Sequence, residues 1–179
     1  MSSSLDVIKQ ILDKEMAMPA NRVWAYNQNN DLPTDSKLFI VLHYGKRDVI
    51  ANNVRYKRTV NGLQEVQAIN LCEDVMISLL SRNNEARDRA HEALLALGST
   101  YSRQLQEKNK IHISTTGNVY DASFLEGTSR INRFDTKIKI FKAYEKIKSV
   151  DYYDKYNFEV WAGSPDGSIT KETFNIEEK

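Results

Sequence analysis

The first part of the chain has apolar residues at helical spacing. After a serine run, apolar side chains recur every three or four positions, and Pro19 ends the pattern. Ser4 is the predicted N-cap, because a serine hydroxyl there can accept a hydrogen bond from a free backbone N–H. The pattern predicts a helix over about 4–17, with its buried stripe formed by Leu5, Ile8, Ile11, Leu12 and Met16.

Two strands are predicted next. Residues 22–26 (RVWAY) are a short strand candidate, and the Asn, Asp, Pro and Ser content of 27–36 predicts a loop. Residues 38–44 (LFIVLHY) are apolar at both odd and even positions, except for His43. Such a strand is typical of the middle of a sheet that is covered on both faces.

The stretch from Arg55 to Ala68 (RYKRTVNGLQEVQA) predicts a β-hairpin. Asn61-Gly62 tolerates the positive φ angles of a type I′ turn, which favours strands over about 48–60 and 63–80. This register places Arg58 opposite Glu65 and Tyr56 opposite Gln67, and the length of the second strand predicts a bulge or a bend near 72–74.

Both faces of this hairpin become polar toward its turn, and a two-stranded ribbon alone is marginally stable in water. One hypothesis is an ordinary solvated hairpin at a sheet edge. The other is an arm that reaches a neighbouring subunit.

A second helical region follows the hairpin. An apolar stripe runs through 86–105, with Asn83 or Asn84 as the predicted cap and polar side chains on the opposite face. Gly98 interrupts the pattern, so we expect a kink there or a division into two helices.

The last third of the chain predicts mainly strands. Residues 111–114 (IHIS) form a short strand, and 115–129 connect it, through a turn at Gly117-Asn118, to a strand over 130–144. The alternation in that strand loses its phase at Phe141-Lys142, which predicts a bulge or an end. Residues 152–162 are expected to pair with it, and a turn at 163–167 leads to a last strand over 168–176.

This order of elements predicts a single α+β domain over 1–179, with a mostly antiparallel sheet and helices packed on one face. A long projecting hairpin is expected at about 48–80, and a C-terminal extension at about 163–179.

Composition narrows the function classes. The 25 basic and 24 acidic side chains nearly cancel, which argues against a nucleic-acid-binding domain that depends on a net positive field. The one cysteine, Cys72, excludes an internal disulfide framework. The N-terminal residues have neither a basic start nor a long apolar run, so the chain is expected to be cytosolic at synthesis and not inserted in a membrane.

The sequence has none of the close spacings that hold metals, phosphates or activated nucleophiles. His43, His91 and His112 are far apart and are interpreted as structural or solvated histidines. Cys72 is interpreted as a small strand residue. The prediction is that the chain is not an enzyme and has no catalytic residue, no cofactor and no metal site.

One charged series has three possible uses. Lysines alternate with apolar residues over 137–148, as on the sheets of single-strand nucleic-acid binders. The same alternation is typical of a half-exposed strand whose lysines prevent stray pairing. A third use is a surface for an acidic protein partner. The candidate partner-surface residues are Lys137, Lys139 and Lys142.

Several segments together resemble a known family. They are RVWAYNQN followed by LFIVLHYG, LQEVQAINLC leading into EARDRAHEALLALGS, IHIS followed by VYDASFLEG, and INRFDTKIKIFKAYE. They are similar to the neck or tail-terminator (tail-completion) proteins of long-tailed bacteriophages. A D-x-S-x-L-like stretch of that family corresponds to Asp121, Ser123 and Leu125, and an R-x-x-x-x-x-F-like strand follows it. The resemblance spans about 20–160 and does not cover the extension from Gly163.

The resemblance implies a structural virion protein without chemistry or cofactor. Such proteins form a homohexameric ring that closes the finished tail and joins it to the head connector. The implied partners are further copies of the chain, the tail tube or sheath protein and the connector or adaptor protein, with DNA passing through the lumen without specific binding. The implied location is the neck of the virion, and the host cytoplasm during assembly.

A ring needs a contact between two different surfaces, repeated around an axis, and the hairpin laid on the next subunit would provide one. The subunit-interface candidates are Arg55, Tyr56, Lys57, Arg58, Glu65 and Gln67. The competing hypotheses are a nucleic-acid-binding module that uses the lysine-rich strand, and a small enzyme with an unrecognised site.

Overall fold

The computed structural model describes residues 3–26, 33–60, 62–115, 118–126, 129–150, 155–163 and 169–177. The chain has an α+β fold, as the order of predicted elements indicated, and most of its strand pairs are antiparallel. The helices are α1 (Ser4–Glu15), α2 (Glu85–Asp88), α3 (Ala90–Leu97) and α4 (Thr100–Asn109). The strands are β1 (Val23–Ala25), β2 (Phe39–Thr59), β3 (Gly62–Ser81), β4 (Ile111–Ser114), β5 (Val119–Asp121), β6 (Phe124–Glu126), β7 (Ser129–Val150), β8 (Lys155–Gly163) and β9 (Ile169–Glu177).

The residues group into two compact units. The first comprises Met1–Asn53 and Ala68–Glu145, and the second comprises Val54–Gln67 and Lys146–Lys179. The strands β2, β3 and β7 contribute residues to both units. The single domain over 1–179 stays a prediction.

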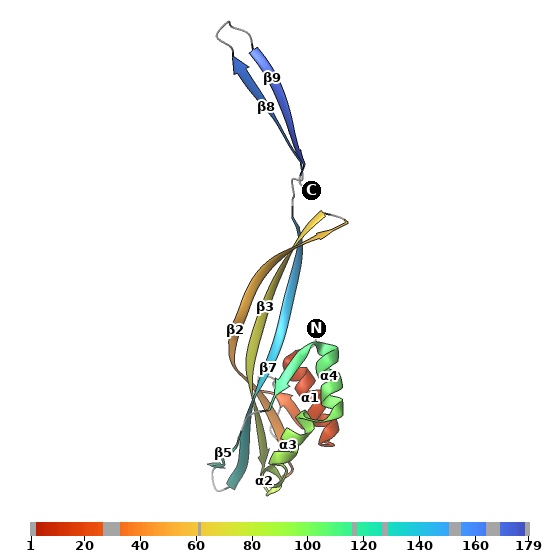
Figure 1. Cartoon of the computed structure of the whole chain (residues 1–179). Helices are drawn as coiled ribbons and strands as arrows, with labels where there is room; N and C mark the ends of the chain where they lie inside the picture. Colours follow the sequence, from red (N-terminus) through yellow and green to blue (C-terminus); the bar gives the residue numbers. More distant parts are fainter. Residues whose placement is uncertain are drawn as a thin grey trace. The chain divides into compact units, whose positions relative to one another are not determined.

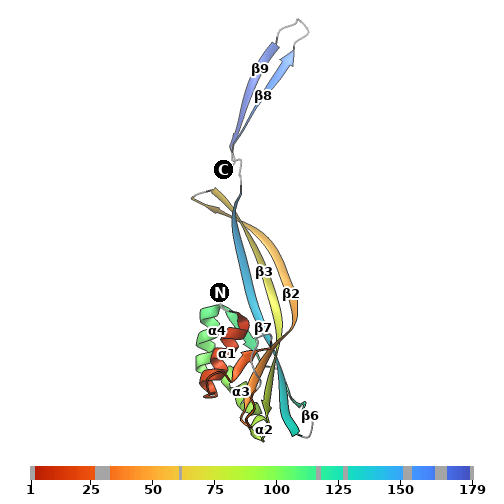
Figure 2. The same ribbon diagram turned by 180° about the vertical axis from the view of Figure 1, so that it is seen from behind.

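The main sheet has the strand order β1-β2-β3-β7-β4, and β5 and β6 also pair with β7. The short β1 runs parallel to β2, with Val23 opposite Ile40. The strand β4 runs antiparallel to β7, with Ile113 opposite Ile140. The helices α1, α3 and α4 lie on one face of this sheet (Figures 1 and 2), where most of the core is buried.

The helix α1 is fixed by its first residues. Its N-cap is Ser3 and not the predicted Ser4, because Ser3 forms a capping box with Asp6. Ser4 is instead the first helical residue, and its buried hydroxyl donates to the Glu73 carboxylate at 2.8 Å. The predicted apolar stripe is confirmed, with Ile8, Ile11 and Leu12 fully buried.

The predicted strand at 38–44 is buried on both faces over 38–42, as predicted, but not over its last two residues. Leu38, Ile40 and Leu42 belong to the core beneath the helices, whereas Phe39 and Val41 belong to a second cluster with Trp24. The rings of Trp24 and Phe39 are stacked with centroids 5.4 Å apart. The apolar run therefore serves both faces of the sheet.

The predicted second helical region is divided, as Gly98 indicated. Gly98 is the C-cap of α3, and the Ser99 hydroxyl caps α4 by accepting a hydrogen bond from the Ser102 N–H. At the N-terminus of α2, the Asn83 side chain accepts a hydrogen bond from the Glu85 N–H, while the Asn84 side chain makes no cap hydrogen bond. Lys110 ends α4 in the left-handed conformation and leads directly into β4.

The predicted interruption of β7 is wrong. In β7, Ile138, Ile140 and Lys142 are all buried, so the alternation passes through Phe141-Lys142 without a change of phase and the strand continues to Val150. The Lys142 ammonium lies 4.9 Å from the Tyr144 ring centroid, which lets the lysine stem be buried. In β3, alternate residues stay buried from Leu71 to Ile77, so the burial pattern shows no bulge at 72–74, and the alternative of a bend there stays a prediction.

The C-terminal strand pairing also differs from the prediction. The strand β8 pairs with β9 in a separate two-stranded sheet, whereas the sequence predicted that it pairs with the strand at 130–144. The predicted turns involve Asn61, Gly117 and 164–167, which lie outside the described residues. Gly62 has a φ of +106°, as a turn of the predicted kind requires, and the register that places Arg58 opposite Glu65 stays a prediction.

Candidate subunit interface

The edge of β2 on the side of β1 is called the outer edge here. Among the described residues, β1 pairs with it over Ile40–Leu42. The Ile40 N–H donates to the Arg22 carbonyl at 2.7 Å, and the Tyr26 N–H donates to the Leu42 carbonyl at 2.9 Å. Beyond Leu42, among the residues that the structure describes, β3 is the one strand paired with β2.

Both faces of β2 are also exposed along this edge. Every residue from Tyr44 to Arg58 is exposed, whereas a strand on a core buries alternate side chains. Val49 and Ile50 are adjacent, so they point to opposite faces, and their exposed fractions are 59% and 56%. A long edge strand is a template for pairing with another chain.

The start of this edge is joined to α1 by hydrogen bonds and an ion pair. The Glu73 carboxylate on β3 is buried, accepts from the Ser4 hydroxyl at 2.8 Å and pairs with the Arg47 guanidinium at 2.7 Å. The Tyr44 and Ser3 hydroxyls are 2.6 Å apart. These contacts connect the start of the edge to the helix-bearing part of the first unit.

The predicted interface residues near the hairpin turn belong to the second unit. Glu65 and Gln67 lie two apart on β3 and are half-buried, and the Gln67 amide donates to the Glu65 carboxylate at 2.5 Å. On β2, the exposed members of the set are Arg55, Tyr56, Lys57 and Arg58.

The structure does not gather the predicted lysines on one surface. Lys137 pairs with Asp74 at 2.7 Å, and Lys139 is exposed on the same face of β7. Lys142 is buried on the other face with Ile138 and Ile140. The alternation in sequence is therefore divided between an ion pair, an exposed lysine and a buried one.

The D-x-S stretch has a structural role in the turn between β5 and β6. The Ser123 N–H and hydroxyl donate to the Asp121 carboxylate at 2.9 and 2.5 Å, and these hydrogen bonds lower the pKa of Asp121. The Arg133 N–H donates to the Ser123 hydroxyl at 3.1 Å, which fixes this turn to β7. Leu125 is exposed.

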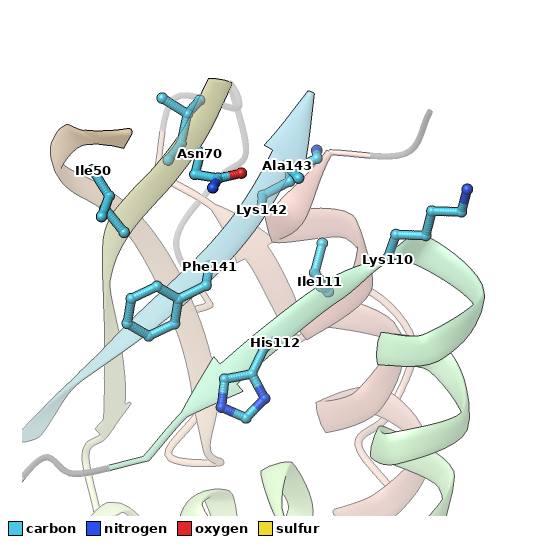
Figure 3. A pocket seen from close by; sticks show the side chains of 9 residues that line it. Ile50, Asn70, Lys110, Ile111, His112, Phe141, Lys142 and Ala143 are labelled. Atoms are coloured by element: carbon cyan, nitrogen blue, oxygen red, sulfur yellow. The ribbon is translucent and has the colours of Figure 1, made fainter. Parts of the chain in front are cut away.

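A cavity of about 460 Å³ opens where β4 begins (Figure 3). Apolar side chains from four strands line it, and Phe141 lies between Ile50 and His112 in the figure, with its ring centroid 6.1 Å from that of His112. The complete lining is Ile50, Asn70, Leu71, Lys110, Ile111, His112, Phe141, Lys142 and Ala143. Sequence reasoning missed this cavity, because its residues come from four distant segments.

The three histidines are separated in space as they are in sequence. His43 on β2 is half-buried with its ring centroid 4.5 Å from that of Tyr26, whereas His91 on α3 and His112 on β4 are exposed. Burial lowers the pKa of His43, the charge of Arg133 lowers it further, and Asp135 opposes the shift. Within the described ranges, no group of three or more His, Cys, Asp or Glu residues is placed to hold a metal ion.

The sequence matches no protein-family model, and comparison with curated proteins finds no match. Among the helices that the structure describes, none combines the length and the apolar composition needed to cross a membrane.

Proposed function

We propose that the chain is a structural subunit that assembles with copies of itself into a ring, as the neck and tail-terminator proteins that its sequence resembles do. The observation that carries the proposal is the part of β2 in the first unit, which is exposed on both faces from Tyr44 to Asn53 and has no described strand partner on its outer edge there. A partner that covers this strand would bury Val49 and Ile50 and pair its backbone groups.

The charges of β2 favour a ring over a simple two-fold dimer. Residues 44–58 contain five basic side chains and one acidic side chain. If the edge paired antiparallel with its own copy about Ala51, Arg47 would lie opposite Arg55 of the other copy, and like charges directly opposite each other are destabilising. The edge is therefore better matched by a different surface, and a contact between two different surfaces closes into a ring when the rotation allows it. The five basic residues are Lys46, Arg47, Arg55, Lys57 and Arg58, and the acidic one is Asp48.

In a phage neck, this ring would cap the tail and provide the surface that joins the head connector. The alternative of a nucleic-acid-binding module that uses the lysine-rich strand has less support, because Lys137 is paired with Asp74 and Lys142 is buried.

The test is the mass and shape of the particles in solution. We expect rings in negative-stain images and a single multimeric mass by mass photometry, formed alone or on purified tail tubes. The variant Val49→Glu places a charge on the exposed strand and should weaken assembly. The control Leu95→Glu makes the same kind of change at an exposed position on α3 and should assemble normally. A chain that stays monomeric alone and with tail tubes contradicts the proposal.

A further inference from the structure

The second unit carries a cluster of basic side chains. The end of β2 (54–59), the start of β3 (62–67) and the end of β7 (146–150) belong to this unit, and both overall views show them together (Figures 1 and 2). These segments hold five basic residues and one acidic residue, a net charge of +4. All five basic residues are exposed. They form what we call the basic cluster: Arg55, Lys57, Arg58, Lys146 and Lys148.

The described part of the chain leaves much of this charge unneutralised. In the first unit, Lys46 and Lys137 each pair with an aspartate at 2.7 Å. By contrast, the three lysines of the basic cluster make no ion pair with any described residue. The one carboxylate, that of Glu65, is half-buried and accepts a hydrogen bond from the Gln67 amide. Because like charges repel each other, the basic cluster is complementary to an anionic partner.

The charges of the basic cluster follow the strands. Alternate residues of a strand point to the same face and lie about 7 Å apart. Arg55 and Lys57 are such a pair on β2, and Lys146 and Lys148 are another on β7. The segment 54–59 alone is about 20 Å long. The basic cluster therefore matches an extended polyanion better than a compact anion held in a pocket.

Double-stranded DNA is an anion of this form. It carries one charge per about 1.7 Å of its axis, or about 12 along the length of the segment 54–59. Its phosphates also accept hydrogen bonds from tyrosine hydroxyls, and Tyr56, between two residues of the basic cluster, is 62% exposed. An acidic protein would instead be anchored by side chains in a pocket, and the cavity at the start of β4 is lined by residues of the first unit alone.

We propose that the basic cluster binds the phosphate backbone of double-stranded DNA without reading its sequence. The inference goes beyond the proposed function and does not depend on it, because one copy of the chain presents the whole cluster. The near balance of charge over the whole chain does not oppose it. Residues 151–179 contain seven acidic side chains and three lysines, so acidic and basic residues are concentrated in different segments.

The test measures the binding of the full-length chain to a fluorescein-labelled duplex of about 30 base pairs by fluorescence anisotropy, between about 50 and about 200 mM salt. If each of the five basic residues neutralises one phosphate, the logarithm of the affinity should fall with the logarithm of the salt concentration with a slope of about −4 to −5. This slope corresponds to a loss of about 250- to 1,000-fold in affinity over that range. It is measured on the unchanged chain, so it does not depend on whether a variant folds.

Two charge reversals on the same strand locate the contact. Lys148→Glu removes one residue of the basic cluster, so it should lose at least about tenfold in affinity at about 50 mM salt and reduce the salt slope by about 1. Lys139→Glu makes the same change at an exposed position of β7 in the first unit and should lose less than about twofold. Lys57→Gln removes a charge without adding one and should also reduce the slope by about 1. Circular dichroism checks that the variants remain folded.

Three outcomes overturn the inference. If the unchanged chain does not bind the duplex at about 50 mM salt, or binds it with a slope near zero, the basic cluster is not a DNA surface. If Lys139→Glu weakens binding as much as Lys148→Glu, the DNA lies on the first unit. If poly-L-glutamate competes as well as an unlabelled duplex of the same charge, the basic cluster is a surface for acidic proteins. The ring of the proposed function is tested separately, by the mass of the particles.

Discussion

Arg47→Ala should destabilise the folded chain far more than Lys46→Ala, although the two residues are neighbours on β2. Each makes an ion pair at 2.7 Å, Lys46 with Asp48 and Arg47 with Glu73. The cations are exposed to a similar extent, at 72% and 57% of their side-chain surface. The carboxylates differ, because the Asp48 side chain is 51% exposed and that of Glu73 is 2% exposed.

The magnitude follows from this difference in burial. Losing an exposed pair costs about 0–1 kcal/mol, because water solvates both ions. Removing one partner of a buried pair costs about 3–5 kcal/mol, because a charge is left buried and uncompensated. Glu73 keeps its hydrogen bond from Ser4, and the Arg47 end of the pair reaches solvent. We therefore expect a loss of about 2–3 kcal/mol for Arg47→Ala.

The assay is urea unfolding at neutral pH and at a protein concentration low enough to keep the chain monomeric. With a slope of about 2–3 kcal/mol per molar urea, Arg47→Ala should lower the midpoint by about 1 M. Lys46→Ala should lower it by less than about 0.4 M.

A double variant tests the cause. Glu73→Gln removes the buried charge but keeps an oxygen that can accept from Ser4. In the Arg47→Ala/Glu73→Gln chain, the free energy of unfolding should recover to within about 0.5 kcal/mol of that of Glu73→Gln alone. The reasoning is refuted if Arg47→Ala and Lys46→Ala cost the same, or if the two changes at 47 and 73 simply add.

Three further predictions concern other parts of the chain. Because the pKa of His43 is lowered from 6.5, the unfolded chain binds a proton there more readily, so stability should fall as the pH drops below 6.5. In urea unfolding between about pH 7.5 and about pH 5.5, the free energy of unfolding should fall less steeply with pH for His43→Gln than for the unchanged chain. Equal slopes for the two chains would contradict this. Gly62→Ala should cost about 1–2 kcal/mol in thermal unfolding because its φ is +106°, whereas Gly98→Ala, whose Cβ would meet the Leu95 carbonyl oxygen at an ordinary 3.6 Å, should be nearly neutral. Equal costs for the two glycines would show that the strain argument is wrong. Replacing Arg55, Lys57 and Arg58 together with Glu should weaken assembly in mass photometry, while circular dichroism shows that the monomer stays folded. Unchanged assembly would mark the hairpin tip as an ordinary surface.

Local periodicity and backbone sterics made several elements predictable. The buried stripe of α1 and the division at Gly98 follow from neighbours within one or two helical turns. The strand β4 has the predicted bounds, 111–114, and the apolar run at 38–42 is buried on both faces. Each of these features depends on residues that are close in sequence, so the sequence contains the information directly.

The candidate interface was only partly predictable. The sequence indicated a long hairpin with polar faces near its turn, and β2 and β3 are indeed long neighbouring strands. It did not indicate that exposure begins as early as Tyr44, because the apolar residues Val49 and Ile50 suggest a covered strand. Whether a strand is covered depends on the length of its neighbours, and β1 is only three residues long.

The sequence by itself determined the class of fold and the local elements of this protein. Tertiary structure decided the pairing of β8 with β9, the burial of Lys142 in phase with Ile138 and Ile140, and the ion pair that joins Arg47 to Glu73. It also assembled the cavity at the start of β4 from four separate strands. The physical reason is that strand pairing and the burial of charge are set by contacts between residues far apart in the chain, and no local pattern records them.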